Sequence, residues 1–249
     1  MRALSVEMIK LKRSLSWLVV VLLPIAVTVL GAATNLTRGE QPEDGWHTVW
    51  LQSVGFHGLF PLALGVAVLA SLVWRSEHHG SNWNALMSGP TPTATIVAAK
   101  SAVVAGMAAL IQLIMLGAVI VVGAVAFDLP GMLPAEYLWT TLLVIIAVVP
   151  LAVLQSSFSM LSRSFAAPIA VALVGTGVSV VALMVIGTPA VISPYGLATR
   201  ATQLGTGTFS DTGTVTVGGV VTVLVASAAL TVALIAATTA ILERRDTRG

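Results

Sequence analysis

The chain has 249 residues, of which 57% are hydrophobic and only 9% are charged, and its formal net charge is +2. Soluble globular proteins carry about 25% charged residues, so this composition excludes an ordinary soluble domain and indicates a polytopic membrane protein. The apolar runs are long and continuous, which favours transmembrane helices over the short alternating strands of an outer-membrane barrel. The sequence has no cysteine, which excludes disulfides, cysteine-ligated metals and thiol catalysis. The small net charge gives no indication of a nucleic-acid partner.

Residues 1–15 predict an amphipathic helix that lies along the membrane surface. Leu4, Met8, Leu11 and Leu15 recur at spacings of four, three and four, which places them on one apolar stripe of a helix. The alternative is the start of a signal peptide whose apolar core would follow, but the small residues after that core make a poor cleavage site.

Six apolar segments follow, and we predict an all-α membrane protein with six transmembrane helices. Each segment has about the 20 residues that a helix needs to cross a bilayer. The third is longer than one crossing requires, which indicates a helix that is tilted, broken or extended beyond the membrane. The predicted spans are 16–33, 51–74, 95–125, 138–161, 166–186 and 218–242, so that residues 16–242 form one transmembrane domain before a charged tail at 243–249.

Three of the connecting segments have a distinctive composition. The first, 35–50, is acidic and ends in Trp46 and Trp50, which are predicted to anchor this side at the membrane interface. The second, 75–94, is rich in polar and turn residues. The third, 187–217, has a first half compatible with short helices that dip back, and a second half, rich in Gly, Thr and Ser, that predicts an exposed loop.

The distribution of positive charge predicts the orientation. Ten of the twelve Lys and Arg residues lie on the side that holds the two termini and the loop 75–94, and only Arg38 and Arg200 lie on the other side. Because cytoplasmic segments of membrane proteins carry the excess of Lys and Arg, we predict that both termini and the loop 75–94 are cytoplasmic.

The loop 75–94 contains a short helical pattern. Ser81 is a suitable helix cap, Trp83, Leu86 and Met87 follow at spacings that share one face, and a Ser-Gly-Pro sequence ends the helix. Two interpretations of the apolar face remain open. Either it inserts into a groove of a soluble partner, or the three side chains lie among the lipid headgroups.

Just before this pattern, Glu77, His78 and His79 are neighbouring residues that can bind metals. Adjacent side chains diverge on a helix, and the chain has no HExxH spacing, so we predict no metal site. Glu77 is expected instead to cap a helix or to pair with a nearby Arg or Lys.

Among the polar residues within the predicted spans are His57, Gln112 and the group of Gln155, Ser156 and Ser157. Polar side chains in a membrane either line a substrate path or hold helices together by hydrogen bonds, and the sequence leaves both roles open. An intramembrane hydrolase that used His57 would need a second catalytic group at the same depth, and no such group is evident.

Several motifs of energy-coupled or catalytic proteins are missing. The chain has no GxxxxGK[ST] loop and no GxSxG turn, and its predicted spans contain no set of carboxylates. The chain is therefore predicted not to bind nucleotide, hydrolyse a substrate or carry protons by itself. Its energy source must then be another subunit.

Two segments carry a family resemblance. Residues 7–14, EMIKLKRS, precede a span that contains Pro24, and the loop that follows the second span contains the series Glu77, Gly80, Ser81, Trp83, Leu86, Pro90 and Lys100. The first segment resembles the ExxKLKRS…P start of ABC-2 type permeases, including the lantibiotic-immunity and bacitracin-resistance permeases. The second is similar to their E-x-x-G-(T/S)-x-(W/R)-x-x-L-x-x-x-P…K loop. His78 and His79 depart from that loop, where acidic or basic residues are commoner.

This resemblance implies a six-span permease subunit with the type-2 ABC exporter (ABC-2) fold. Two such subunits, identical or different, would stand side by side in a bacterial cell membrane, and two copies of a separate ATPase would bind ATP and Mg²⁺. The amphipathic start would be a connecting helix. The loop 75–94 would hold the coupling helix that docks on the ATPase, with Glu77, Trp83, Leu86 and Met87 as its coupling residues. The permease itself would be no enzyme and would hold no cofactor.

The cargo that the resemblance implies is hydrophobic or amphiphilic, such as a peptide antibiotic, a drug or a lipid. A rival interpretation comes from a different class of protein. It is a scaffold or sensor subunit that uses the same loop to recruit a cytoplasmic partner and transports nothing.

Overall fold

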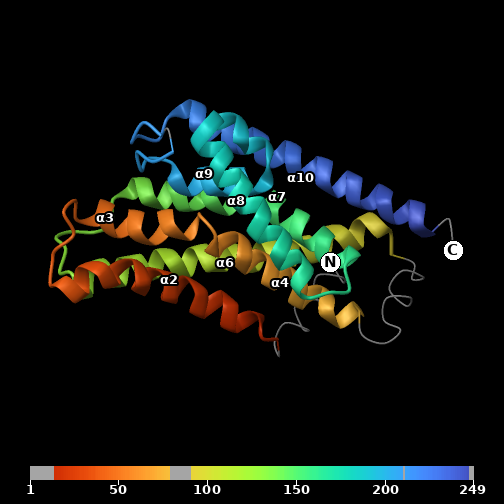
Figure 1. Cartoon of the computed structure of the whole chain (residues 1–249), viewed down its shortest axis with the longest axis horizontal. Coiled ribbons are helices and arrows are strands. Elements are labelled where there is room, and N and C mark those ends of the chain that lie inside the picture. The colour runs from red at the N-terminus through yellow and green to blue at the C-terminus, as the bar shows by residue number, and fades with distance from the viewer. Residues whose placement is uncertain (1–13, 79–90, 210, 247–249) are drawn as a thin grey trace.

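The computed structural model describes residues 14–78, 91–209 and 211–246. The described part is a bundle of helices; most of its long helices run roughly along one axis, and α8 crosses them at an angle (Figure 1). Most of the predicted amphipathic segment 1–15 and the loop residues Trp83, Leu86 and Met87 lie outside the described residues. The helices are α2 (Ser16–Arg38), α3 (Trp46–Trp50), η1 (Leu51–Gly55), α4 (Pro61–His78), α6 (Thr93–Val121), η2 (Val122–Ala126), α7 (Ala135–Leu161), α8 (Ala166–Ile186), η3 (Thr188–Ile192), α9 (Pro194–Gln203) and α10 (Val217–Asp246).

Within the described residues, five helical segments are long and apolar enough to cross a membrane. They are Ser16–Arg38, Thr93–Ala126, Ala135–Leu161, Ala166–Ile186 and Val217–Arg244. The sixth, in α4, is apolar but shorter, because its apolar part covers only Pro61–Arg75. The protein is therefore an all-α, multi-pass membrane protein with five candidate spans and one shorter apolar helix.

The segment 51–74, for which one helix was predicted, is divided in the structure. α3 continues directly into the π-helix η1, and turn residues at 58–60 separate this part from α4. Pro61 has no N–H, so it cannot donate the usual helical hydrogen bond to the residue four positions earlier. Hydropathy does not register such a break, because Gly and Pro change the backbone without making the segment polar.

α9 donates side-chain hydrogen bonds to the backbone around this break. Thr199 Oγ1 donates to the carbonyl oxygen of Gly58 at 2.8 Å, and Gln203 Nε2 donates to that of Gly55 at 2.9 Å. Gly58 permits the close approach, because a Cβ at this position would lie 1.7 Å from Thr202 Oγ1. Irregular backbone inside a membrane protein needs such partners from neighbouring elements, and α9 provides them.

The segment 187–217 forms two short helices and then a loop. η3 and α9 pack against α8, and α9 also packs against α7 (Figure 1). The loop that follows is exposed from residue 212 onward, but Asp211 is held by an ion pair to Arg200 of α9, with a nitrogen–oxygen distance of 3.0 Å. The first half of this segment is thus part of the packed bundle.

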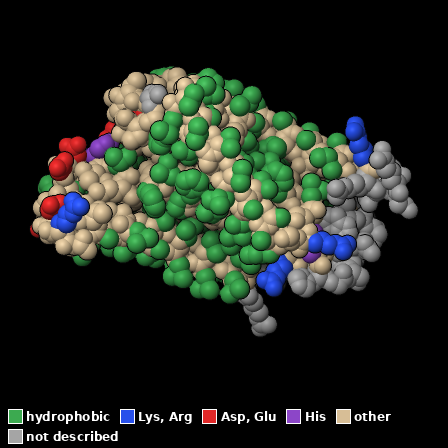
Figure 2. Space-filling view, in the orientation of Figure 1, with side chains coloured by type: hydrophobic (Ala, Val, Ile, Leu, Met, Phe, Trp, Pro, Cys, Tyr) green, Lys and Arg blue, Asp and Glu red, His purple; other side chains and the backbone are tan. Residues whose placement is uncertain are grey.

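α7 lies at the centre of the bundle and packs against α4, α6, α9 and α10. Of its most apolar stretch, 61% is buried, against 11% for α10. The core around it contains Leu69 of α4, Ile111 of α6 and Leu151 of α7, which have no exposed surface. α2, α8 and α10 therefore form the outer surface of the bundle, and their exposed side chains are largely apolar (Figure 2).

Trp46 and Trp50 do not form the interfacial anchor that the sequence predicts. Both are buried, and Trp50 stacks on Tyr137 with ring centroids 4.7 Å apart. The indole Nε1 of Trp46 donates to the carbonyl oxygen of Pro130 at 3.1 Å. The prediction was wrong because a tryptophan near a span end serves equally well as packing between helices, and this pair packs against α7 and the α6–α7 connection.

Candidate functional site

The polar loop begins and ends beside a buried ion pair. Glu77 lies in the last turns of α4 and Lys100 in the second turn of α6, and both side chains are buried. Lys100 Nζ lies 3.0 Å from Glu77 Oε1. A buried charge is strongly unfavourable without a partner, so each of these side chains requires the other. The sequence predicts that Glu77 caps a helix or pairs with a nearby basic residue, and in the structure it pairs with Lys100.

An aromatic residue covers the same ion pair. The ammonium of Lys100 lies 4.9 Å from the ring centroid of Trp74, a cation–π geometry. The indole Nε1 of Trp74 in turn donates to Ser156 Oγ of α7 at 2.8 Å. Trp74 therefore links the ion pair between α4 and α6 to the central helix.

A second connection joins the end of α4 to α7. His78 Nε2 donates to the carbonyl oxygen of Ser159 at 2.8 Å, and the hydroxyls of Ser71 and Ser159 lie 3.4 Å apart. The two helices that flank residues 79–90 are thus fastened to each other and, through α4, to α7. In Figure 1 the end of α4 and the start of α6 lie at the same end of the bundle as the end of α10.

The three residues predicted for a substrate path lie in two separate polar contacts. Gln112 Nε2 lies 3.2 Å from His57 Nε2, and both side chains are buried between α6 and the broken segment. Gln155 Nε2 donates to the hydroxyl of Tyr195 in α9 at 2.7 Å. Contacts of this kind hold helices together, and the role of the three residues in a substrate path stays a prediction.

Among the described residues, no group of three or more His, Asp or Glu side chains is placed to hold a metal ion. His79 and the coupling residues Trp83, Leu86 and Met87 lie outside the described part of the chain. Glu77 is the one member of the predicted coupling set whose contacts are described, and it faces Lys100 within the bundle.

Trp74 and Tyr195 contribute to these sites although the sequence indicates no role for them, and the pairing of Lys100 with Glu77 and of Ser156 with Trp74 appears only in the structure. The sequence does contain a signal for the helix that carries Tyr195. Ser193 followed by Pro194 is a typical helix start, although the segment around it is rich in turn residues. For Trp74, Ser156 and Lys100 the sequence does not indicate the partners, because these depend on how the helices pack.

The model of the family described as "ABC-2 family transporter protein" matches residues 3–179, which is more than half of the chain. The protein belongs to the ABC-2 transporter family. No curated protein and no solved structure matches the chain.

The match confirms the resemblance seen in the sequence, because it contains both the start at 7–14 and the loop from Glu77 to Lys100. The protein is therefore the membrane, or permease, component of an ABC-2 transporter. Components of this kind are typically non-catalytic and work with a separate ATPase. The match ends within α8, so it includes the ion pair but neither α9 nor α10.

Proposed function

We propose that this ABC-2 component is the permease subunit of an ATP-driven exporter in a bacterial cell membrane, and that loop 75–94 docks on its ATPase. Two copies of the ATPase would act on two permease subunits, identical or different. The observation that carries the proposal is the buried pair of Glu77 and Lys100, which joins the helices on either side of the loop. A docking loop can transmit a movement of the ATPase to the membrane helices only if the helix ends that flank the loop are held firmly together.

In this mechanism the ATPase moves the loop, and α4 and α6 follow together. Separating Glu77 from Lys100 would leave two buried charges unpaired, and a single uncompensated buried charge already costs about 3–5 kcal/mol. The pair therefore keeps the helix ends together during the movement. Trp74 and His78 pass the displacement to α7 through their hydrogen bonds to Ser156 and Ser159.

The proposed topology has six crossings, with α3, η1 and α4 together forming the second. Counted from Trp46 to His78, this segment is long enough to span a bilayer despite its break. On the face seen in Figure 2, acidic side chains gather at one end of the bundle and most of the Lys and Arg side chains at the other. The excess of positive charge supports a cytoplasmic location for the loop and both termini.

The proposed cargo is hydrophobic or amphiphilic, such as a peptide antibiotic, a drug or a lipid, moved along the interface between two permease subunits. Its support is the apolar surface of the outer helices. α2 exposes Leu18, Leu22 and Val29, and α10 exposes Val221, Val225 and Val232. Apolar faces of this kind can contact lipid, a second permease subunit, or a hydrophobic cargo that lies between two subunits.

The docking proposal is tested by Trp83→Ala and Leu86→Asp in the permease co-expressed with its ATPase. Truncation of a central interface residue costs about 2 kcal/mol or more, which corresponds to a loss of about 30-fold in affinity. We expect both variants to insert normally into the membrane but to co-purify with less ATPase and to lower the transport-coupled ATPase rate.

Trp139→Ala is the matched control. Trp139 is 67% exposed and lies in the first turns of α7, whereas α7 contacts the end of α4 through Ser156 and Ser159 in its last turns. Normal coupling in both loop variants would contradict the docking assignment. If the wild-type permease co-purifies with a cytoplasmic protein that is not an ATPase, the scaffold or sensor role would replace the exporter.

A further inference from the structure

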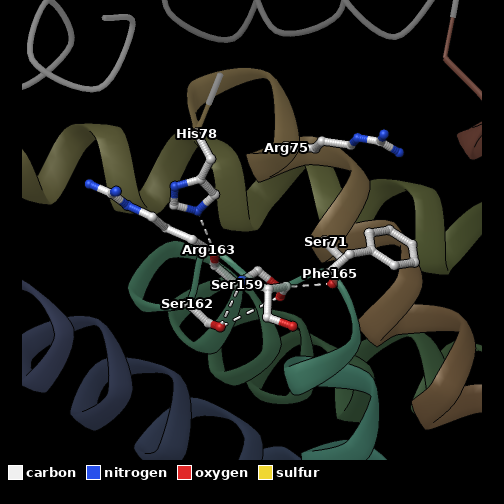
Figure 3. A pocket seen from close by; sticks show the side chains of 8 residues that line it. Ser71, Arg75, His78, Ser159, Ser162, Arg163 and Phe165 are labelled. Atoms are coloured by element: carbon white, nitrogen blue, oxygen red, sulfur yellow. Dashed lines mark hydrogen bonds between the residues drawn. The ribbon is translucent and has the colours of Figure 1, made fainter. Parts of the chain in front are cut away.

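A hollow opens at the basic end of the bundle, between the end of α4 and the short turn that joins α7 to α8. Its volume is about 340 Å³, and the turn, residues 162–165, lines one part of it (Figure 3). Four residues of α4 and α7 line the other part: Ser71, Arg75, His78 and Ser159. In Figure 3 the Arg163 side chain and the Phe165 ring lie on opposite sides of the hollow.

The turn has a fixed conformation, because its two serines bond to its own backbone. The N–H of Ser164 donates to Ser162 Oγ at 3.2 Å, and Ser162 Oγ donates to the carbonyl oxygen of Ser164 at 3.5 Å. The N–H of Ala167 donates to Ser164 Oγ at 3.3 Å, where α8 begins. The large side chains that this turn exposes are Arg163 and Phe165.

Both exposed side chains are of kinds that are enriched at protein interfaces. Arg163 makes no ion pair with any residue that the structure describes, and none of the eight residues around the hollow is acidic. Its guanidinium can therefore pair with a carboxylate from another protein. Phe165 is 43% exposed and offers an apolar contact on the other side of the hollow.

The turn lies beyond the part of α7 that crosses the hydrocarbon core. α7 exposes apolar side chains from Leu138 onward, and roughly 20 residues from there complete a crossing. That length ends near Ser157, one helical turn before α7 ends at Leu161. The hollow therefore faces water at the basic end of the bundle, which agrees with the serines in its lining.

The hollow is also continuous with the base of loop 75–94. Arg75 and His78 line it and belong to the last turn of α4, from which the chain enters residues 79–90. His78 Nε2 donates to the carbonyl oxygen of Ser159 at 2.8 Å, which joins the end of α4 directly to the end of α7. A protein that docks on the loop must therefore lie beside the turn.

We propose that the turn at 162–165 is a second docking site for the ATPase, an inference that rests on the function proposed above. A protruding element of the ATPase enters the hollow, a carboxylate of that element pairs with Arg163, and an apolar side chain packs on Phe165. The site connects the ATPase directly to α7 and α8, whereas the loop leads to α4 and α6. The two contacts together let one movement of the ATPase act on four helices.

The experiment measures the affinity of the purified ATPase of the same transporter for full-length permease in lipid nanodiscs, at several ionic strengths. We expect Phe165→Ala to weaken binding about 30-fold, as truncation of a central aromatic residue of an interface does. Arg163→Glu replaces attraction by repulsion, so we expect a loss of at least about tenfold that becomes smaller as salt is raised. Arg163→Lys keeps the charge and should retain most of the affinity.

Arg38→Glu and Phe56→Ala are the matched controls. The Arg38 side chain is 70% exposed at the opposite end of α2 from the basic end, and Phe56 is 49% exposed beside the break before α4. Neither residue lines the hollow, so both variants should bind the ATPase as the wild type does. Thermal unfolding of every variant in the same nanodiscs shows whether it is folded.

Unchanged affinity in Arg163→Glu and Phe165→Ala would overturn the proposal, and so would an equal loss in the two controls. If the turn contacts lipid headgroups instead, both substitutions change only the thermal stability, which also overturns it. Trp83→Ala is measured in parallel. A loss of affinity in Trp83→Ala without a loss at the turn refutes the second site alone. A loss at the turn without one in Trp83→Ala supports the second site and refutes docking through the loop.

Discussion

At the scale of single residues, the pair of Glu77 and Lys100 is the most consequential contact in the described structure. It joins positions 23 residues apart, on either side of a loop, and Trp74 covers it from α4. Ion pairs on a surface contribute about 0–1 kcal/mol, whereas a buried pair is costly to break from one side only. We propose that the pair holds the end of α4 and the start of α6 together. A comparison of single and double variants tests this role.

We predict that Glu77→Gln and Lys100→Met each lower the free energy of unfolding by about 3–5 kcal/mol, because each leaves one buried charge without its partner. The double variant should lose less than the sum of the two, since it removes both charges. Equilibrium unfolding in mixed micelles measures all three. Strictly additive effects would mean that the two side chains do not interact.

At the scale of elements, the structure depends on α9 packing against a broken helix. The residues that make this contact, Thr199, Thr202 and Gln203, lie in one turn of α9 and face Gly55 and Gly58. α9 therefore replaces hydrogen bonds that the break removes, and it can do so only while its backbone stays close to Gly58. Any side chain at position 58 should force the two elements apart.

We predict that Gly58→Ala destabilises the protein by about 1–3 kcal/mol, the usual cost of inserting a methyl group into a packed site. The added Cβ would meet Thr202 Oγ1 at 1.7 Å, so Thr202→Ala should restore part of the loss. The control is Gly106→Ala in α6, where a Cβ meets nothing within 4 Å. That change should be neutral or stabilising, because alanine favours the helix by about 0.5–1 kcal/mol. Thermal unfolding in detergent compares the three variants, and equal effects at 58 and 106 would contradict the close contact.

At the scale of the whole molecule, charge and hydropathy divide the bundle into three zones. An apolar band lies between an end with acidic side chains and an end with most of the basic ones (Figure 2). The basic end contains the ion pair of Glu77 and Lys100 and the ends of α4 and α6 that flank residues 79–90. The proposed orientation assigns this end to the cytoplasm, where an ATPase would dock.

We predict that Thr212→Cys reacts with a membrane-impermeant thiol reagent in intact cells, and that Arg244→Cys reacts only after the membrane is opened. Both positions are exposed, and they lie before and at the end of α10 respectively. The native chain contains no cysteine, so each variant carries a single reactive thiol. Labelling of Arg244→Cys in intact cells would reverse the orientation.

The sequence by itself determined the class of protein, the positions of the long apolar helices and the ABC-2 family. These properties are sums over neighbouring residues, or short motifs, and they do not depend on how the helices pack. The tertiary structure decided the rest: that Lys100 is the partner of Glu77, that the segment with Pro61 is broken and held by α9, and that Trp46 and Trp50 are packed inside. Each of these is a contact between residues far apart in the chain, and hydropathy cannot encode it, because many different pairings of the same helices would bury the same apolar surface.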